Sequence, residues 1–168
     1  MTAIVRLDPW EYEWAYRVGI GRCAANWESH DAKHYSRDRM EEDRRASPAS
    51  ALCELAVAKL LNQYWSGSVW YRGHAANKRR PDVGKNIEVR RVRSRPGPTI
   101  RRTDLGRLVY GCRITHPEWR EVEVLGYYAV PGSIEELEAD ERLVRYGDHF
   151  VCPVQHLSKL TQDECQSA

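Results

Sequence analysis

The alternation of apolar and polar positions predicts two long helices in the first third of the chain. Apolar residues recur at roughly helical spacing from Trp10 to Cys23, after the helix-start pair Asp8-Pro9. They predict an amphipathic helix over residues 8–28, with a break near Gly19 and Gly21. A second helix, rich in alanine and leucine, is predicted to begin at Ser47-Pro48 and to end near Asn62. The polar segment between them is either a solvated helix or a mobile connection.

The rest of the chain has the shorter period that is typical of strands. Runs of β-branched and alternating residues predict strands over residues 69–71, 87–92, 108–114, 122–130 and 150–154. A short helix is predicted over 133–141, with Ser133 as its N-cap and Glu136 completing a capping box. This order of elements predicts an α/β fold with a central mixed β-sheet and flanking helices.

Length and composition narrow the class of protein. A chain of 168 residues corresponds to one domain. No stretch approaches the roughly 18 apolar residues of a membrane-spanning helix, and the N-terminus lacks the apolar core of a secretory signal. The five cysteines are scattered and form no CxxC pair, so a zinc site has little support and reduced thiols are expected. We therefore expect a cytoplasmic protein with no membrane segment.

The charge is distributed unevenly, although the net charge is only +2. Between Arg72 and Arg107 twelve lysines and arginines face three acids, a local charge of +9. Between Glu118 and Asp148 nine acids face three arginines, a local charge of −6. A basic middle region favours a polyanionic partner, and the acidic stretch is most simply an exposed helical face.

A small set of charged residues could carry chemistry. Glu54 interrupts the apolar face of the second helix, Asp82 follows a proline after a basic run, and Glu88 and Arg90 lie two apart on the strand 87–92. Side chains two apart on a strand point the same way. A short turn through residues 84–86 could bring Asp82 beside Glu88, and two converging carboxylates suit a hard cation such as Mg²⁺.

Pro81-Asp82 followed by Glu88-Val89-Arg90, with Glu54 in the preceding helix, resembles the PD-(D/E)XK nuclease superfamily. The resemblance covers roughly residues 47–157 and is greatest to small single-domain members among resolvase-like and phage-encoded proteins. It implies a restriction-endonuclease-like αβββαβ core, with extra N-terminal helices outside it. The resulting division is an N-terminal helical extension (1–46), a nuclease-like domain (47–160) and a flexible tail (161–168).

The resemblance also implies roles for individual residues. Asp82, Glu88 and the main-chain carbonyl of Val89 would bind Mg²⁺ or Mn²⁺, and Glu54 would be an accessory ligand. Arg90 stands where the superfamily has lysine: it keeps its charge and can grip a phosphate, but it is a poor general base. The surrounding basic residues would form a rim that tracks DNA phosphates. They are Arg79, Arg80, Lys85, Arg91, Arg93, Arg95, Arg101 and Arg102.

Three functions follow from these residues. The first is a Mg²⁺-dependent DNA nuclease that uses Glu54, Asp82, Glu88 and Arg90. The second is a catalytically inactive protein on the same scaffold that binds DNA or a protein partner. The third is a small structural or inhibitory protein whose acidic stretch meets a basic partner. The sequence leaves open whether the N-terminal helices cap the sheet or mediate a homodimer.

Overall fold

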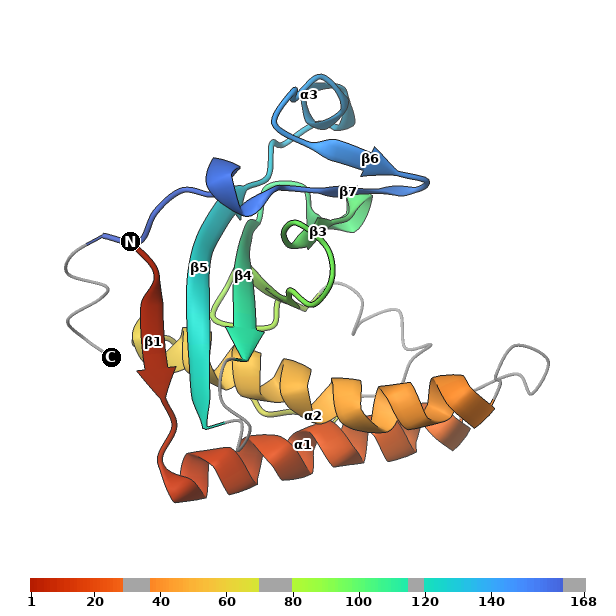
Figure 1. Ribbon diagram of the computed structural model, residues 1–168, viewed down its shortest axis with the longest axis vertical. Helices are drawn as coiled ribbons and strands as arrows, with labels where there is room; N and C mark the ends of the chain where they lie inside the picture. The colour runs from red at the N-terminus through yellow and green to blue at the C-terminus, as the bar shows by residue number, and fades with distance from the viewer. Residues whose placement is uncertain (29–36, 70–79, 115–119, 162–168) are drawn as a thin grey trace.

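The computed structural model describes residues 1–28, 37–69, 80–114 and 120–161, with the backbone alone for 26–28 and 37–46. Its two long helices are α1 (Pro9–Glu28) and α2 (Arg37–Leu60), which lie side by side (Figure 1). The predicted break in the first helix is wrong, because α1 is continuous through Gly19 and Gly21. The missing side chain of Gly19 lets α2 approach α1 closely, because a Cβ on Gly19 would lie 2.3 Å from the Cα of Pro48.

The predicted start of the second helix is also wrong. Helix α2 begins ahead of Ser47 and runs through Pro48, which therefore lies inside it. A proline inside a helix removes one hydrogen bond and costs about 3 kcal/mol. Here the following turns pack into the core, where Ala51, Leu52 and Leu55 are all buried. Tertiary packing thus outweighs the local preference for a helix start.

In the described part of the chain, four strands form the central sheet in the order β1-β5-β4-β2. They are β1 (Ala3–Arg6), β5 (Glu121–Ala129), β4 (Leu108–Ile114) and β2 (Ile87–Arg91). The pair β2–β4 is parallel and the other two pairs are antiparallel, so the predicted mixed sheet is confirmed. The sequence pattern did not predict β1, although it pairs with β5 at the edge of this sheet.

The last predicted strand belongs to a second, smaller sheet. Strand β7 (His149–Val151) lies between β3 (Thr99–Ile100) and β6 (Val144–Tyr146). The short helix α3 (Ile134–Glu138) begins at Ser133, whose hydroxyl accepts the N–H of Glu136, as predicted. Two single turns of 3-10 helix, η2 (Arg102–Asp104) and η3 (Val154–His156), complete the described elements. The predicted strand 69–71 is not found at Val69, and its other two residues lie outside the described ranges.

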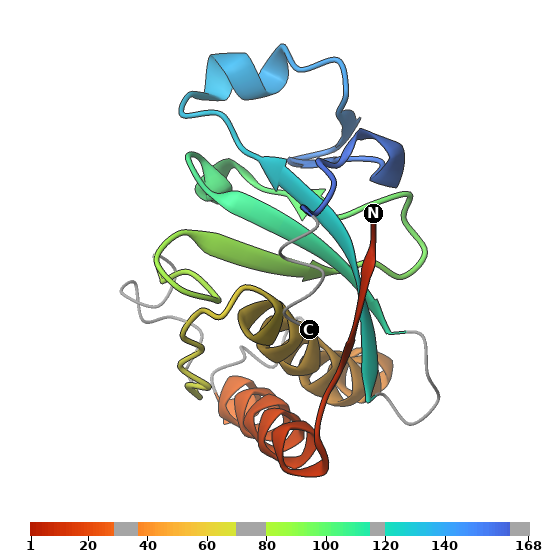
Figure 2. The ribbon, with the colours of Figure 1, turned by 90° about the vertical axis from the view of Figure 1, so that its left-hand side faces the viewer.

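The molecule is layered, with the central sheet in the middle (Figure 2). Helix α2 lies directly against this sheet and α1 packs on α2, so one hydrophobic core fills the space between helices and sheet. A second core joins the other face of the sheet to the small sheet and α3, through residues such as Val109, Phe150 and Leu137. The loop 93–98 is held close to the small sheet, because a Cβ on Gly97 would lie 1.8 Å from the carbonyl oxygen of Cys152.

Residues 3–28, within the predicted N-terminal extension, take part in the same fold as the rest. Val5 and Leu7 belong to the core between the helices and the central sheet, as do Ala15 and Val18 of α1. None of the described helices combines the length and the apolar character needed to cross a membrane.

Candidate functional site

The turn before β2 brings Asp82 beside the strand. The amide groups of Asp82 and Val83 both donate to the carbonyl of Ile87, at 2.9 and 3.1 Å, and Gly84 has the positive φ (57°) that this tight turn requires. The carboxylate of Asp82 then accepts the main-chain N–H of Val89 at 2.8 Å. The predicted approach of Asp82 to the strand is therefore present.

Three oxygen atoms converge on one nitrogen at this point. Nη1 of Arg90 lies 3.3 Å from Oδ2 of Asp82, 3.0 Å from Oε2 of Glu88 and 3.1 Å from the carbonyl oxygen of Val89. These oxygens belong to the three residues that the resemblance assigns to the metal. The guanidinium of Arg90 lies among them.

Two further residues, Asp104 and Arg107, extend the cluster, although no pattern in the sequence singles them out. Nη2 of Arg90 donates to Asp104 at 3.0 Å, and the other oxygen of Asp104 accepts the main-chain N–H of Arg101 at 2.9 Å. Arg107 contacts the second oxygen of Glu88. Glu88 is thus shared between two arginines, and Asp104 and Glu88 are both buried.

Glu54 is buried on α2 and its carboxylate is already bound. Nη1 of Arg22, from α1, donates to both its oxygens at 2.7 and 2.8 Å, and the indole N–H of Trp65 donates to one of them at 2.9 Å. A buried carboxylate needs such partners, so Arg22 and Trp65 explain why an acid is tolerated on this helix face. Its role as an accessory metal ligand stays a prediction.

The carboxylates in this region influence one another's ionisation. Burial, and next the charge of Glu54, raise the pKa of Asp82 to about 6, although Arg90 opposes the rise. Burial and the charge of Asp82 also raise the pKa of Glu88. Burial alone would lower the pKa of Arg90, but the charges of Asp104, Asp82 and Glu88 together raise it. The acids are therefore close enough to resist ionisation together and need positive charge beside them.

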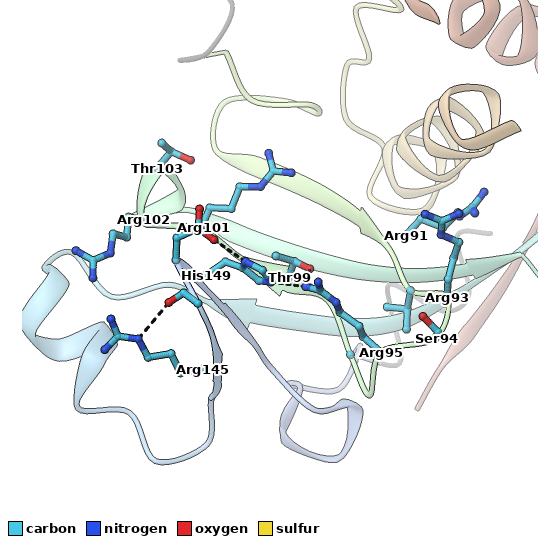
Figure 3. A pocket seen from close by; sticks show the side chains of 14 residues that line it. Arg91, Arg93, Ser94, Arg95, Thr99, Arg101, Arg102, Thr103, Arg145 and His149 are labelled. Atoms are coloured by element: carbon cyan, nitrogen blue, oxygen red, sulfur yellow. Dashed lines mark hydrogen bonds and ion pairs between the residues drawn. The ribbon is translucent and has the colours of Figure 1, made fainter. Parts of the chain in front are cut away.

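An arginine-rich cleft of about 1190 Å³ adjoins the acid cluster. Figure 3 shows Arg91 and Arg93 at one end, Arg102 and Arg145 at the other, and Arg95 and His149 between them. Arg101 also lines the cleft, and its main-chain N–H to Asp104 connects the cleft to the cluster. Among the described lining residues Asp148 is the only acid.

Neighbouring arginines disfavour the charge of two arginines that line the cleft, Arg91 and Arg101. Burial, and then the neighbouring charge of Arg93, lower the pKa of Arg91. Burial and the charge of Arg90 lower the pKa of Arg101. A concave surface with crowded positive charge attracts anions, because a bound anion relieves this repulsion.

The cleft contains five of the eight basic residues predicted to contact DNA. They are Arg91, Arg93, Arg95, Arg101 and Arg102. Arg80 and Lys85 do not line it, and Arg79 lies outside the described residues. Arg145 and His149 were missed, because they lie in or next to the segment that reads as acidic and reach the cleft through the β6–β7 hairpin.

The oxygens present suit a hard cation in kind, being two carboxylates and one carbonyl. Within residues 1–28, 37–69, 80–114 and 120–161, no three His, Cys, Asp or Glu side chains gather closely enough to hold a metal ion. A cation here would therefore depend on the Val89 carbonyl and would need the place that Arg90 now takes.

Comparisons of the sequence with protein-family models and with curated proteins, and of the fold with solved structures, gave no match. The function of this chain is therefore inferred from its own geometry.

Proposed function

We propose that the protein is a metal-dependent phosphodiesterase that cleaves DNA. The observation that carries the proposal is the convergence of oxygens from Asp82, Glu88 and Val89 on one point beside an arginine-lined cleft. In this proposal those three residues hold Mg²⁺ or Mn²⁺. Such an ion, when bound, polarises a phosphate and lowers the pKa of a coordinated water.

The cleft supplies the binding half of the proposal. Its arginines contact backbone phosphates, which positions DNA without reading its sequence. Arg101 lies where the cleft meets the acid cluster, so a phosphate bound there would lie next to Arg90. Arg90 keeps its positive charge at neutral pH and can stabilise negative charge on that phosphate.

The order of elements agrees with the proposed nuclease core. Helix α2, strands β2, β4 and β5, helix α3 and strand β7 occur in the αβββαβ order of the PD-(D/E)XK superfamily, with β3 inserted between β2 and β4 and β6 inserted before β7. The agreement is one of chain order, since β7 pairs within the second sheet. It supports the PD-(D/E)XK core as the finer description of this mixed α/β fold.

A second function, binding of DNA without cleavage, is favoured by one observation. The guanidinium of Arg90 already satisfies the three oxygens that a cation would use. The cleft would then bind DNA while the acid cluster is purely structural.

A cleavage assay and a binding assay on the same variants separate these functions. Supercoiled plasmid is incubated with Mg²⁺ or Mn²⁺ and wild-type protein, Asp82→Ala or Glu88→Ala, with Arg17→Gln as the control. Arg17 is exposed on α1 and pairs with Glu13. We expect wild type and Arg17→Gln to nick the plasmid and both acid variants to lose this activity.

The other outcomes are equally informative. Cleavage that survives both acid substitutions overturns the assignment of the site. Binding at low salt without cleavage by wild type favours the second function. No binding at low salt removes both functions.

A further inference from the structure

Arg90 holds a position with the chemical features of a cation site. A single nitrogen, Nη1, contacts oxygens of Asp82, Glu88 and Val89, while Nη2 reaches Asp104. The side chain of Arg90 is 15% exposed and that of Asp104 is 2% exposed. The guanidinium of Arg90 therefore places a positive charge inside a largely buried cluster of carboxylates.

We infer that Arg90 is an internal counter-ion that competes with a divalent cation for the oxygens of Asp82, Glu88 and Val89. Metal binding in the wild-type protein then requires the guanidinium to leave, and the apparent affinity for the metal is reduced by that requirement. This inference rests on the proposed function, since it concerns the same three oxygens. It adds that Arg90 controls whether those oxygens are available.

The charges of the cluster support this competition. Asp82, Glu88 and Asp104 contribute three negative charges when ionised, and Arg90 and Arg107 contribute two positive charges. Without the guanidinium of Arg90, two net negative charges remain, which one divalent cation neutralises. Close carboxylates cannot all stay ionised without such compensation, so either cation can fill the role but not both at once.

The hydrogen bonding of Arg90 indicates that its position is set by the acids. Its Nε is buried and has no hydrogen-bond partner among the residues that the structure describes. A buried donor without a partner is destabilising, because it has lost its hydrogen bond to water. The contacts of the two Nη groups must offset this cost, so the guanidinium gains less from the pocket than a fully bonded arginine would.

The test measures Mn²⁺ binding by isothermal titration calorimetry without nucleic acid. The variant Arg90→Gln removes the competing charge and keeps much of the side-chain volume. Arg17→Gln is the control, because it removes the same charge from an exposed position on α1, outside the acid cluster and the cleft. If the guanidinium occupies the position in nine-tenths or more of the molecules, Arg90→Gln binds Mn²⁺ about tenfold or more tightly than wild type.

We expect Arg17→Gln to bind Mn²⁺ as wild type does, and the double variant Arg90→Gln/Glu88→Gln to lose the gain. An Arg90→Gln affinity no higher than that of wild type overturns the inference, and so does an equal gain in Arg17→Gln. Should Arg90→Gln fail to fold, Arg90→Lys is used. Its shorter side chain keeps the charge but cannot hold Asp104 and the three oxygens together, so tighter Mn²⁺ binding than wild type is again expected and its absence overturns the inference.

Calorimetry also separates this inference from the proposed function. Tighter Mn²⁺ binding by Arg90→Gln, with no plasmid cleavage by wild-type protein, upholds the competition and rejects the nuclease. Cleavage by wild type, with unchanged Mn²⁺ affinity in Arg90→Gln, upholds the nuclease and rejects the competition.

Discussion

At the scale of single residues, Asp82 links the pH of the solution to folding. Its pKa is about 6 in the folded protein, against 3.8 when unperturbed. The folded state therefore binds a proton more readily than the unfolded state, and the stability contributed by this group is lost as pH rises from about 4 to about 6. The difference corresponds to about 3 kcal/mol at most.

The variant Asp82→Asn cannot titrate, so it should escape this loss. We expect its free energy of unfolding, relative to wild type, to improve by up to about 3 kcal/mol between pH 4 and pH 8, mostly below pH 6. Urea unfolding at each pH measures the difference. A difference that is constant with pH would contradict the raised pKa.

Asp140 supplies a control of the opposite sign. Hydrogen bonds from Arg142 lower the pKa of this carboxylate, and a hydrogen bond from Tyr128 adds to the effect. A lowered pKa contributes stability above about pH 4 that is lost as the pH falls further. Asp140→Asn should therefore be most destabilised near neutral pH and approach wild type in acid.

Glu54 and Arg22 show how burial changes the value of an ion pair. Their closest atoms are 2.7 Å apart, as are those of the pair Glu13–Arg17, but the first pair is buried and the second exposed. Glu54→Gln removes the buried carboxylate charge that Nη1 of Arg22 contacts and should cost about 3 kcal/mol or more. Glu13→Gln should cost less than about 1 kcal/mol.

Thermal and urea unfolding of the two variants measure this contrast. Similar small losses in both would mean that Arg22 does not hold Glu54 in place. The carboxylate of Glu54 would then be available for the accessory role that the sequence predicts.

At the scale of elements, Gly19 sets the distance between α1 and α2. Alanine is favoured over glycine inside a helix by about 1 kcal/mol, so local preference alone predicts that Gly19→Ala stabilises the protein. A Cβ at this position would lie 2.3 Å from Cα and 2.5 Å from N of Pro48, which are backbone atoms. Overpacking of this kind typically costs 1–3 kcal/mol, about enough to reverse the sign.

We therefore expect Gly19→Ala to destabilise the protein and Gly21→Ala to change it much less. Around Gly21 the closest atom, at 2.8 Å, belongs to the side chain of Val69, which can rotate. Urea unfolding of both variants tests the expectation. A stabilised Gly19→Ala would show that the helices can separate at little cost.

The elements whose own residues define them were predicted well from the sequence. Strands β2, β4 and β5 have strong β-branched patterns, and Ser133 marks the start of α3 through its own side chain. The start of α2 could not be predicted, because Pro48 gives a local signal that packing against α1 overrides. Strand β1 has four residues and depends on its pairing with β5, which local sequence does not reveal.

In the candidate site, likewise, the contacts between residues close in sequence could be predicted, and those that depend on tertiary structure could not. Glu88 and Arg90 share a strand, and Asp82 is one short turn away, so local rules bring them together. Arg107 reaches Glu88 because β2 and β4 pair in parallel, and Arg22 reaches Glu54 because two helices pack. Such partners come from tertiary structure, and nothing in the spacing of the sequence indicates them.

At the scale of the whole molecule, two distant segments build the arginine cleft. Residues 91–103 supply five arginines, and the β6–β7 hairpin supplies Arg145 with His149 (Figure 3). The segment 118–148 is acidic overall, but the fold places its Arg145 among the other cleft arginines. The basic surface therefore includes residues from both the basic segment 72–107 and the acidic segment 118–148, which are separate along the chain.

This composition of the cleft predicts how DNA binding depends on salt. Each arginine that contacts a phosphate releases counter-ions, so losing one such contact should reduce the slope of log K against log[salt] by about one. Arg93→Gln and Arg145→Gln, one from each segment, should each reduce the slope by about one and together by about two. Arg17→Gln, on α1, should leave it unchanged. Fluorescence anisotropy of a labelled duplex across salt concentrations gives the slopes; a normal slope for Arg145→Gln would mean that DNA does not span the two segments.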